Sequence, residues 1–490
     1  MPAHIAALVH AMLAMGLAVA VLPADAFGGN RVRGMAAWFF AAFLLFILDD
    51  PFVIFTAIFL AYLVLAPASP GKRVAFFILI AGAFPVYVQQ LLPFPGINYL
   101  MLLDYYRVSS CALLVPLLFL PKPEDSPRLA WSITDTCVVT YVLYTSAMIA
   151  AADSFTNGLR FMLDQSLVIA VPYFALSRAA TRLQDVDNCF RAIVAASVIL
   201  AAIALAATAK QWDFYRYKEP ITGAAIPEFR AGFLRIAATI NTHSLGFHLV
   251  AALMVLEYVR TRVNFGFVRL WSVRAMLLGG LYLTGSRGAM AGLATALGVY
   301  MVLSAKSAGI RWTLVLAFAV GSAFAVIWLL SGESAKYDPY GTFDYRQQLL
   351  VTSLRYIADY PLFGDLQFMK SGKFDALIQG QGIIDITNLY LLVTLRFGLL
   401  GFALFFIPFV LTIYKLIFAR YDDPSGENRK LRHMRNVLCS LLAGWLVLVI
   451  TTSDVGLTLH LGLLLVALGH ALTQTRAVVH KTIQFSGVVR

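Results

Sequence analysis

Long apolar stretches recur along nearly the whole chain and leave little room between them for charged residues. Hydrophobic residues occupy 60% of the 490 positions and charged residues only 13%, and the mean hydropathy is +0.78. Soluble domains are only about half apolar. A transmembrane helix needs about 20 apolar residues, because each backbone polar group in the bilayer core must be satisfied within the helix. The sequence therefore predicts an all-α, polytopic integral membrane protein with about 12–15 transmembrane helices.

The candidate spans are separated by short polar segments. They lie near residues 3–22, 34–48, 51–67, 74–92, 109–121, 130–151, 159–177, 189–208, 244–259, 269–284, 288–305, 312–330, 388–415, 435–452 and 455–473. The first span ends in LPADAF, which is similar to a signal-peptide cleavage site, but no Lys or Arg precedes its apolar run. We therefore expect it to be retained as a span.

Positive charge in the connecting loops orients these spans. Residues 260–274 hold four arginines and no acid, and the segment 415–435 is also basic, so the positive-inside rule places both in the cytoplasm. Alternation then puts the loop 209–243, the TGSRG corner at 284–288 and the long loop 331–387 together on the opposite face. The net charge of +12 reflects this topology, and no nucleic-acid-binding signature accompanies it.

The long loop 331–387 contains a helix signal. TFDYRQQLLVTSLRYIADYP (342–361) opens with Asp344 three residues before Gln347, as a capping box does. Leucines and an isoleucine follow at helical spacing, and the pattern stops before a proline. We expect a large, partly helical periplasmic loop whose helix lies along the membrane surface, with Arg346 near its start.

Cationic residues gather on the face where topology does not require them. They are Lys210, Arg216, Lys218, Arg230, Arg235, Arg287 and Arg346. A guanidinium matches phosphate oxygens two at a time, and Gly285 and Gly288 beside Arg287 would let an anion reach the first amides of a helix. The pattern favours a phosphate-bearing lipid as the partner. The alternative is a set of interfacial arginines that reach lipid headgroups.

Four segments together resemble a known family. They are FLRIAATINTHSLG (233–246), TGSRGAMAG (284–292), YPLFGD (360–365) and TNLYLLVTLRFGLLGF (387–402). Their order and spacing are similar to those of the O-antigen ligase and Wzy-type polysaccharide polymerase superfamily, in which an SRG corner precedes a large periplasmic loop. The resemblance covers about residues 209–415.

The resemblance implies a GT-C-like, metal-independent glycosyltransferase without a cofactor, in the bacterial inner membrane with its active site facing the periplasm. It would polymerise or transfer glycan repeats of an exopolysaccharide or O-antigen. The partners it implies are an undecaprenyl-pyrophosphate-linked oligosaccharide donor, a glycan or lipid-linked glycan acceptor and membrane lipids, with no nucleic acid.

The same resemblance assigns roles by position. Arg235 and Arg287 would hold the donor pyrophosphate, Arg346 would assist from the loop helix, and Asn388 would mark the acceptor side. Arg230, in the same loop as Arg235, joins the substrate-binding set. Arg287 is also expected to act in catalysis, by stabilising charge on the leaving pyrophosphate.

One position departs from the family. Its ligases usually carry a histidine directly before the asparagine, whereas this chain has Thr387 before Asn388. Threonine cannot serve as the general base that a histidine provides. The nearest ionisable residue is Asp385, which we expect to be the catalytic base; its alternative role is the N-cap of the following helix. The departure favours a polymerase over a ligase that transfers the glycan to lipid A core.

The chain divides into N-terminal transmembrane helices (1–208), a ligase- or polymerase-like core (209–415), and C-terminal transmembrane helices with a cytoplasmic tail (416–490). A flippase or transporter of lipid-linked glycans is the alternative function, since it would also bind pyrophosphate through arginines. A transporter, however, lines a path through the bilayer with polar groups, whereas these arginines are confined to one face.

Other polar residues have weaker claims to a role. Asp49 and Asp50 either contribute a catalytic acid or simply end one helix and cap the next. His243 and His248 do not share a helical face as a metal pair would, which favours packing or a sugar contact. The four cysteines lack the spacing of a metal or redox site.

Overall fold

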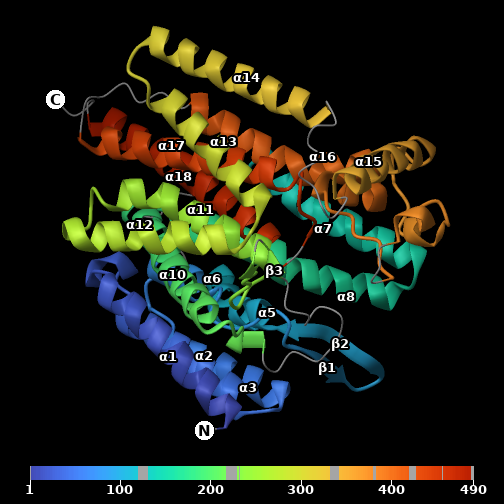
Figure 1. Cartoon of the computed structure of the whole chain (residues 1–490), viewed down its shortest axis with the longest axis horizontal. Coiled ribbons are helices and arrows are strands. Elements are labelled where there is room, and N and C mark those ends of the chain that lie inside the picture. Colours follow the sequence, from blue (N-terminus) through green and yellow to red (C-terminus); the bar gives the residue numbers. More distant parts are fainter. Residues whose placement is uncertain are drawn as a thin grey trace.

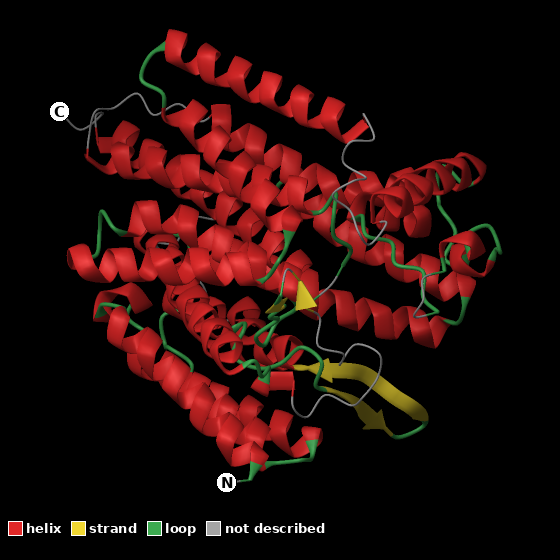
Figure 2. Cartoon of the chain, in the orientation of Figure 1, coloured by secondary structure: helices red, strands yellow, loops and turns green. Residues whose placement is uncertain are grey.

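The computed structural model describes residues 2–119, 131–216, 229–230, 232–330, 342–378, 382–418, 426–454 and 456–486. Within these residues the regular elements are helices apart from two short hairpins, and the helices pack into one bundle (Figure 1, Figure 2). The all-α fold predicted from the apolar stretches is confirmed.

The first half of the chain forms helices α1 to α10. Their bounds are α1 (Ala3–Val21), α2 (Arg31–Ile47), α3 (Pro51–Leu65), α4 (Pro70–Ile80), α5 (Tyr105–Ser109), α6 (Val115–Phe119), α7 (Ile133–Ala152), α8 (Phe155–Gln165), α9 (Val171–Ala179) and α10 (Leu183–Lys210). Single π-helical turns join α5 to α6 and α8 to α9, so that each pair forms one continuous rod.

The second half forms α11 to α18. Their bounds are α11 (Thr242–Val259), α12 (Gly266–Leu283), α13 (Arg287–Ser304), α14 (Ala308–Leu330), α15 (Thr342–Asp359), α16 (Leu389–Phe418), α17 (Gly426–Leu448) and α18 (Thr458–Ser486). Helix α15 is the helix expected inside the long loop, and its existence is confirmed.

Seven helical segments of the described residues are long and apolar enough to cross a membrane. They are α1, α7, the α8–α9 rod, α10, α11, α13 and α16. Shorter apolar helices, including α3 and the α5–α6 rod, lie among them. Every candidate span overlaps a helix, and the predicted count of 12–15 also includes helices such as α2 and α12, which are shorter or less apolar than the seven. The protein is a multi-pass membrane protein.

The candidate span at 74–92 was predicted wrongly over its second half. Helix α4 already ends at Ile80, and the chain then forms the antiparallel hairpin of β1 (Gln89–Phe94) and β2 (Ile97–Asp104). Pro95 and Gly96 make the turn, with Gly96 at φ +85°, as a type II turn requires. A second, much shorter hairpin pairs β3 (Phe229–Arg230) with β4 (Phe233–Leu234).

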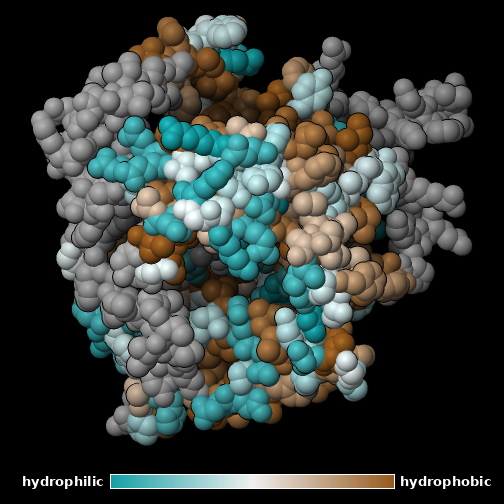
Figure 3. All heavy atoms as spheres, turned by 90° about the vertical axis from the view of Figure 1, so that its right-hand side faces the viewer, coloured by the Kyte–Doolittle hydropathy of each residue, from teal (hydrophilic) through white to brown (hydrophobic). Residues whose placement is uncertain are grey.

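One end of the bundle carries the β1–β2 hairpin, α8 and α15, at the right of Figure 1. We call this end the loop face. Figure 3 views the molecule from this side and shows hydrophilic side chains around a recess near the middle of the face. Polar groups from distant parts of the chain therefore meet at one end of an otherwise apolar bundle.

Close backbone contacts hold the helices behind this recess. A Cβ atom on Gly444 of α17 would lie 2.6 Å from the carbonyl oxygen of Gly292 of α13, and one on Gly246 of α11 would lie 2.7 Å from the Cβ of Ala289. Small residues at such contacts let helices in a membrane approach backbone to backbone. The start of α13 is thus clamped between α11 and α17.

This packing predicts the effect of enlarging Gly444. In Gly444→Val the new side chain meets the α13 backbone, which cannot move aside as a flexible side chain can, and overpacking of this kind costs about 1–3 kcal/mol. We expect thermal unfolding of the purified protein, followed by tryptophan fluorescence, to shift several degrees lower. Gly16→Val is the matched control, because a Cβ at Gly16 of α1 meets no atom within 4 Å. Equal shifts in both variants would contradict the close contact.

Candidate functional site

Arg235 is held in place by two other segments of the chain. Its Nε donates to the carbonyl oxygen of Thr284 at 3.0 Å, and its Nη2 lies 3.2 Å from Nε2 of His243. A guanidinium has donors only, so Nε2 must accept this hydrogen bond. The His243 ring is therefore neutral and carries its proton on Nδ1, which lies 3.2 Å from Oγ of Ser286. Arg235 and His243 together connect the loop before α11 to the TGSRG turn.

The TGSRG turn presents the start of α13 to the same place. Ser286 caps the helix, because its Oγ accepts a hydrogen bond from the backbone N–H of Ala289 at 3.3 Å, and Gly285 adopts φ +59° to make the turn. Arg287 is the first helical residue; its side chain is exposed and forms no hydrogen bond or ion pair with the residues that the structure describes. A guanidinium beside a helix N-terminus is suited to binding an anion.

The turn between α17 and α18 joins the starts of three helices. Thr451 in this turn packs so closely on Gly288 that a Cβ there would lie 2.1 Å from the Thr451 Oγ1. Carbonyl oxygens of the turn accept hydrogen bonds from the amide of Leu389 at 3.0 and 3.1 Å, and one of its amides donates to Oγ of Ser244 at 3.0 Å. The residues just before α16 therefore lie beside the start of α13, and the start of α11 contacts the same turn.

The segment before α16 is fixed by two separate contacts. Asn388 caps α16, since its Oδ1 accepts a hydrogen bond from the amide of Leu391 at 3.2 Å. The Tyr345 hydroxyl on α15 donates to the carbonyl oxygen of Asp385 at 2.7 Å and accepts from its amide at 3.0 Å. The alternative of Asp385 as the helix cap is thus wrong, because Asn388 has that role and the Asp385 carboxylate does not.

The electrostatic surroundings of Asp385 suit a proton acceptor. Asp385 is half-buried, and this burial raises the pKa of its carboxyl group, whereas the nearby guanidinium of Arg346 acts in the opposite direction. A carboxylate with a raised pKa accepts a proton more readily than one in water. Arg346, exposed on α15, is therefore an electrostatic neighbour of Asp385, as the predicted convergence of the outer segments requires.

The structure places five of the six residues predicted for the site in two groups that the α17–α18 turn connects. Arg235 and Arg287 flank the TGSRG turn, and Arg346, Asp385 and Asn388 gather at the start of α16, which the α17–α18 turn holds beside them. The backbone of the sixth, Arg230, lies in β3, and its side chain is outside the part of the structure that is described.

Of two further polar groups, Asp50 has the capping role that the sequence favours, whereas His243 has a role that the sequence does not favour. Asp50 is a helix cap, since its Oδ1 accepts from the amide of Phe52 at 2.8 Å at the start of α3. His243 belongs to the arginine cluster, although the sequence favoured packing or a sugar contact for it. The signal that could have found His243 is its place at the first turn of α11, eight residues after Arg235, on the face expected to converge.

One segment of the chain is similar to a known protein family. Residues 273–406 match the model of the O-antigen ligase family. This match supports the O-antigen ligase and Wzy-type superfamily for that segment of the chain. Its ligase segment contains Arg287, Arg346, Asp385 and Asn388, while Arg235 and His243 precede it. No curated protein matches the chain significantly.

The cluster predicts an effect of His243 on the binding of an anion by Arg235. His243→Ala removes the acceptor that orients Arg235, and hydrogen bonds to charged groups contribute about 1.5–3 kcal/mol. We expect His243→Ala to bind inorganic pyrophosphate at least about tenfold more weakly than the unchanged protein, as measured by calorimetric titration in nanodiscs. His433→Ala is the control. His433 lies near the start of α17, at the end away from the cluster, where its ring is hydrogen-bonded to the Tyr300 hydroxyl, and its loss should leave the affinity for pyrophosphate unchanged. Unaltered binding by His243→Ala would refute the positioning role.

Proposed function

We propose that this O-antigen ligase superfamily member is a polysaccharide polymerase that takes glycan repeats from undecaprenyl pyrophosphate on the periplasmic side of the bacterial inner membrane. The family match supports a glycan-processing membrane enzyme of the ligase or polymerase type. The observation that carries the finer proposal is that the α17–α18 turn contacts two segments: the start of α13, where Arg235 and Arg287 lie, and the start of α16, just after the half-buried carboxylate of Asp385.

The donor head group would lie against the start of α13. The exposed Arg287 guanidinium can bind two phosphate oxygens at once, and the first amides of α13 add donors that favour negative charge. Arg235, held by His243, supplies a second guanidinium in a fixed orientation. Such preorganised donors stabilise the charge that grows on the pyrophosphate as it leaves, which is often the largest contribution to catalysis.

In the proposed reaction, a hydroxyl oxygen of the acceptor glycan forms a bond to the anomeric carbon of the donor sugar. The bond between that carbon and the pyrophosphate oxygen breaks, and its electron pair leaves with undecaprenyl pyrophosphate. The hydroxyl proton passes to the carboxylate of Asp385. Arg346 keeps this carboxylate ionised by its positive charge while burial raises its basicity.

Thr387 supports a polymerase in preference to a ligase. It occupies the position where ligases of the family usually carry histidine, and its side chain has no titratable group. Its buried Oγ1 has no hydrogen-bond partner among the described residues, so it is suited to contacting a substrate hydroxyl. A flippase remains the second candidate for the arginine cluster, and the placement of that cluster at one face supports the enzyme.

Loss of the Arg287 side chain provides the first test. The purified protein, given an undecaprenyl-pyrophosphate-linked oligosaccharide, should lengthen the glycan and release undecaprenyl pyrophosphate. Both should also occur when a metal chelator is present. Arg287→Ala should slow release at least about 100-fold, the magnitude seen when a donor to the transition state is removed. Arg269→Ala is the control, since Arg269 is an exposed arginine on α12, on a segment that the charge pattern assigns to the opposite side of the membrane.

Other results of this assay would contradict particular parts of the proposal. Transport of the lipid across vesicles without release of the pyrophosphate would instead indicate a flippase. Inhibition by the chelator would exclude the metal-independent reaction.

The pH dependence of the rate tests Asp385 as the base. A base must be ionised, so kcat/KM should fall as pH decreases through the pKa of Asp385, which lies above its ordinary value of 3.8. Arg346 lowers that pKa, so Arg346→Gln should move the acid limb of the profile to higher pH. Asp385→Asn should reduce kcat by about 10²–10⁴-fold and abolish the limb. If the acid limb of the kcat/KM profile were unchanged in Asp385→Asn, the limb would report the ionisation of another group.

A further inference from the structure

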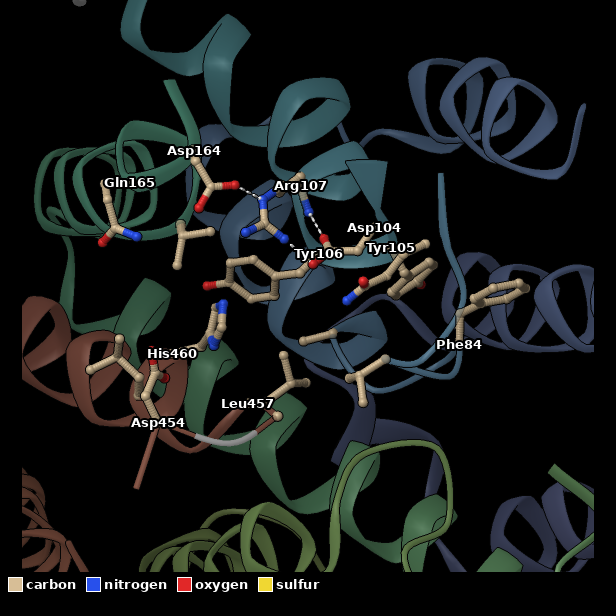
Figure 4. Close-up of a pocket in the computed structure, with 16 residues that line it drawn as sticks. Phe84, Asp104, Tyr105, Tyr106, Arg107, Asp164, Gln165, Asp454, Leu457 and His460 are labelled. Carbon is tan, nitrogen blue, oxygen red and sulfur yellow. Dashed lines mark hydrogen bonds and ion pairs between the residues drawn. The ribbon is translucent and has the colours of Figure 1, made fainter. Parts of the chain in front are cut away.

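A second polar site lies on the loop face outside the ligase segment. It is a cavity of about 350 Å³ between the end of α4, the β1–β2 hairpin, α5, the end of α8 and the start of α18 (Figure 4). Ligand pockets in proteins typically range from about 300 to 1,000 Å³, so this cavity is at the small end of that range. None of its lining residues has a role in the reaction described above.

The charges of the cavity disfavour an anionic ligand. Arg107 forms ion pairs through Nη1 with Asp104 and through Nε with Asp164, so its positive charge is already compensated within the wall (Figure 4). Asp454 adds a third carboxylate, and its side chain has no hydrogen-bond partner among the described residues. The guanidinium of Arg396 also lies near Asp454, so three carboxylates face two guanidinium groups. This excess of carboxylates disfavours phosphate and acidic sugars, and the carboxylates accept hydrogen bonds from hydroxyl groups.

Buried polar atoms in the wall lack partners. The Tyr106 side chain is only 3% exposed, and its hydroxyl makes no hydrogen bond to any residue that the structure describes. Its ring lies 4.1 Å from that of His460, centroid to centroid, and the Nδ1 of His460 is also unpartnered among these residues. An unmade hydrogen bond at a buried polar atom costs about 1–3 kcal/mol, and a ligand with several hydroxyl groups would supply the missing bonds.

The cavity adjoins the arginine cluster. Gly456, in its wall, packs against the start of α11 so closely that a Cβ there would lie 2.8 Å from the Oγ of Ser244 and 2.8 Å from the Cβ of Asn241. Ser244 directly follows His243, which holds Arg235. The cavity and the proposed pyrophosphate site are therefore on the two sides of one short segment.

We propose that this cavity binds an uncharged sugar ring at the end of the acceptor glycan, an inference that rests on the proposed function. The ligase segment supplies most of the groups for the lipid pyrophosphate, whereas the cavity is built from residues outside that segment. Carboxylates, the Gln165 amide and the Tyr106 hydroxyl recognise hydroxyl groups, and the aromatic rings of Tyr105 and Tyr106 provide apolar faces for a sugar ring.

Binding of simple glycosides tests the subsite directly. Saturation-transfer NMR on the full-length protein in nanodiscs would use the methyl glycosides of glucose, galactose and N-acetylglucosamine, with methyl glucuronide as the acidic probe. At least one neutral glycoside should bind, and the glucuronide should not. Tyr106→Phe removes only the unpartnered hydroxyl and should weaken glycoside binding about tenfold while inorganic pyrophosphate binds as before. Tyr414→Phe, an exposed tyrosine on α16, is the matched control.

Turnover then assigns the sugar to the acceptor. In the polymerisation assay Tyr106→Phe should raise the acceptor KM about tenfold and leave the donor KM unchanged; a rise in the donor KM alone would overturn the acceptor assignment. Wild-type glycoside affinity in Tyr106→Phe, or equal binding of the glucuronide, would overturn the subsite itself. Glycoside binding that depends on Tyr106 in a protein without transferase activity would refute the proposed function and leave the sugar site standing.

Discussion

The hydrogen bond between Arg235 and His243 is the interaction on which the rest of the site depends. A guanidinium near the bilayer is costly unless water, a partner or a ligand satisfies it, and even lenient insertion scales put the cost of a mid-membrane arginine at about 2.5–3.5 kcal/mol. Here a neutral imidazole and the Thr284 carbonyl satisfy part of the guanidinium without neutralising its charge. The orientation of the guanidinium is therefore fixed by two contacts from other segments of the chain.

This arrangement works only because the helices behind it cannot separate. Glycines at positions 288, 292 and 444 bring the start of α13 against α17 and the turn that follows it, and the same turn accepts hydrogen bonds from the amide of Leu389. A larger residue at any of these glycines would displace the TGSRG turn relative to the segment that carries Asp385. The close packing of these helices therefore also fixes the geometry of the site.

The sequence was sufficient for the helices and for much of the site, because long apolar runs leave few alternatives in a membrane and because positive charge fixes which loops share a face. It failed where local and distant signals conflict. The run around Pro95–Gly96 is apolar enough to be counted as a span, yet its turn chemistry makes a hairpin. Spacing could not reveal whether Asp385 or Asn388 caps α16, since both precede it closely and only their contacts differ. The cavity around Arg107 joins segments more than 300 residues apart, which no local pattern records.

The loop face places opposite electrostatic environments side by side. The exposed guanidinium of Arg287 at the start of α13 attracts phosphate, whereas the carboxylates of Asp104, Asp164 and Asp454 lie together in the cavity. An acceptor that itself carries a lipid pyrophosphate at one end and neutral sugars at the other would thus experience a field that distinguishes its two ends. Such a field would favour one orientation of the glycan before any specific contact forms, because the excess of carboxylates in the cavity disfavours the charged end. Directional growth of a chain needs this distinction, and charge alone can provide it.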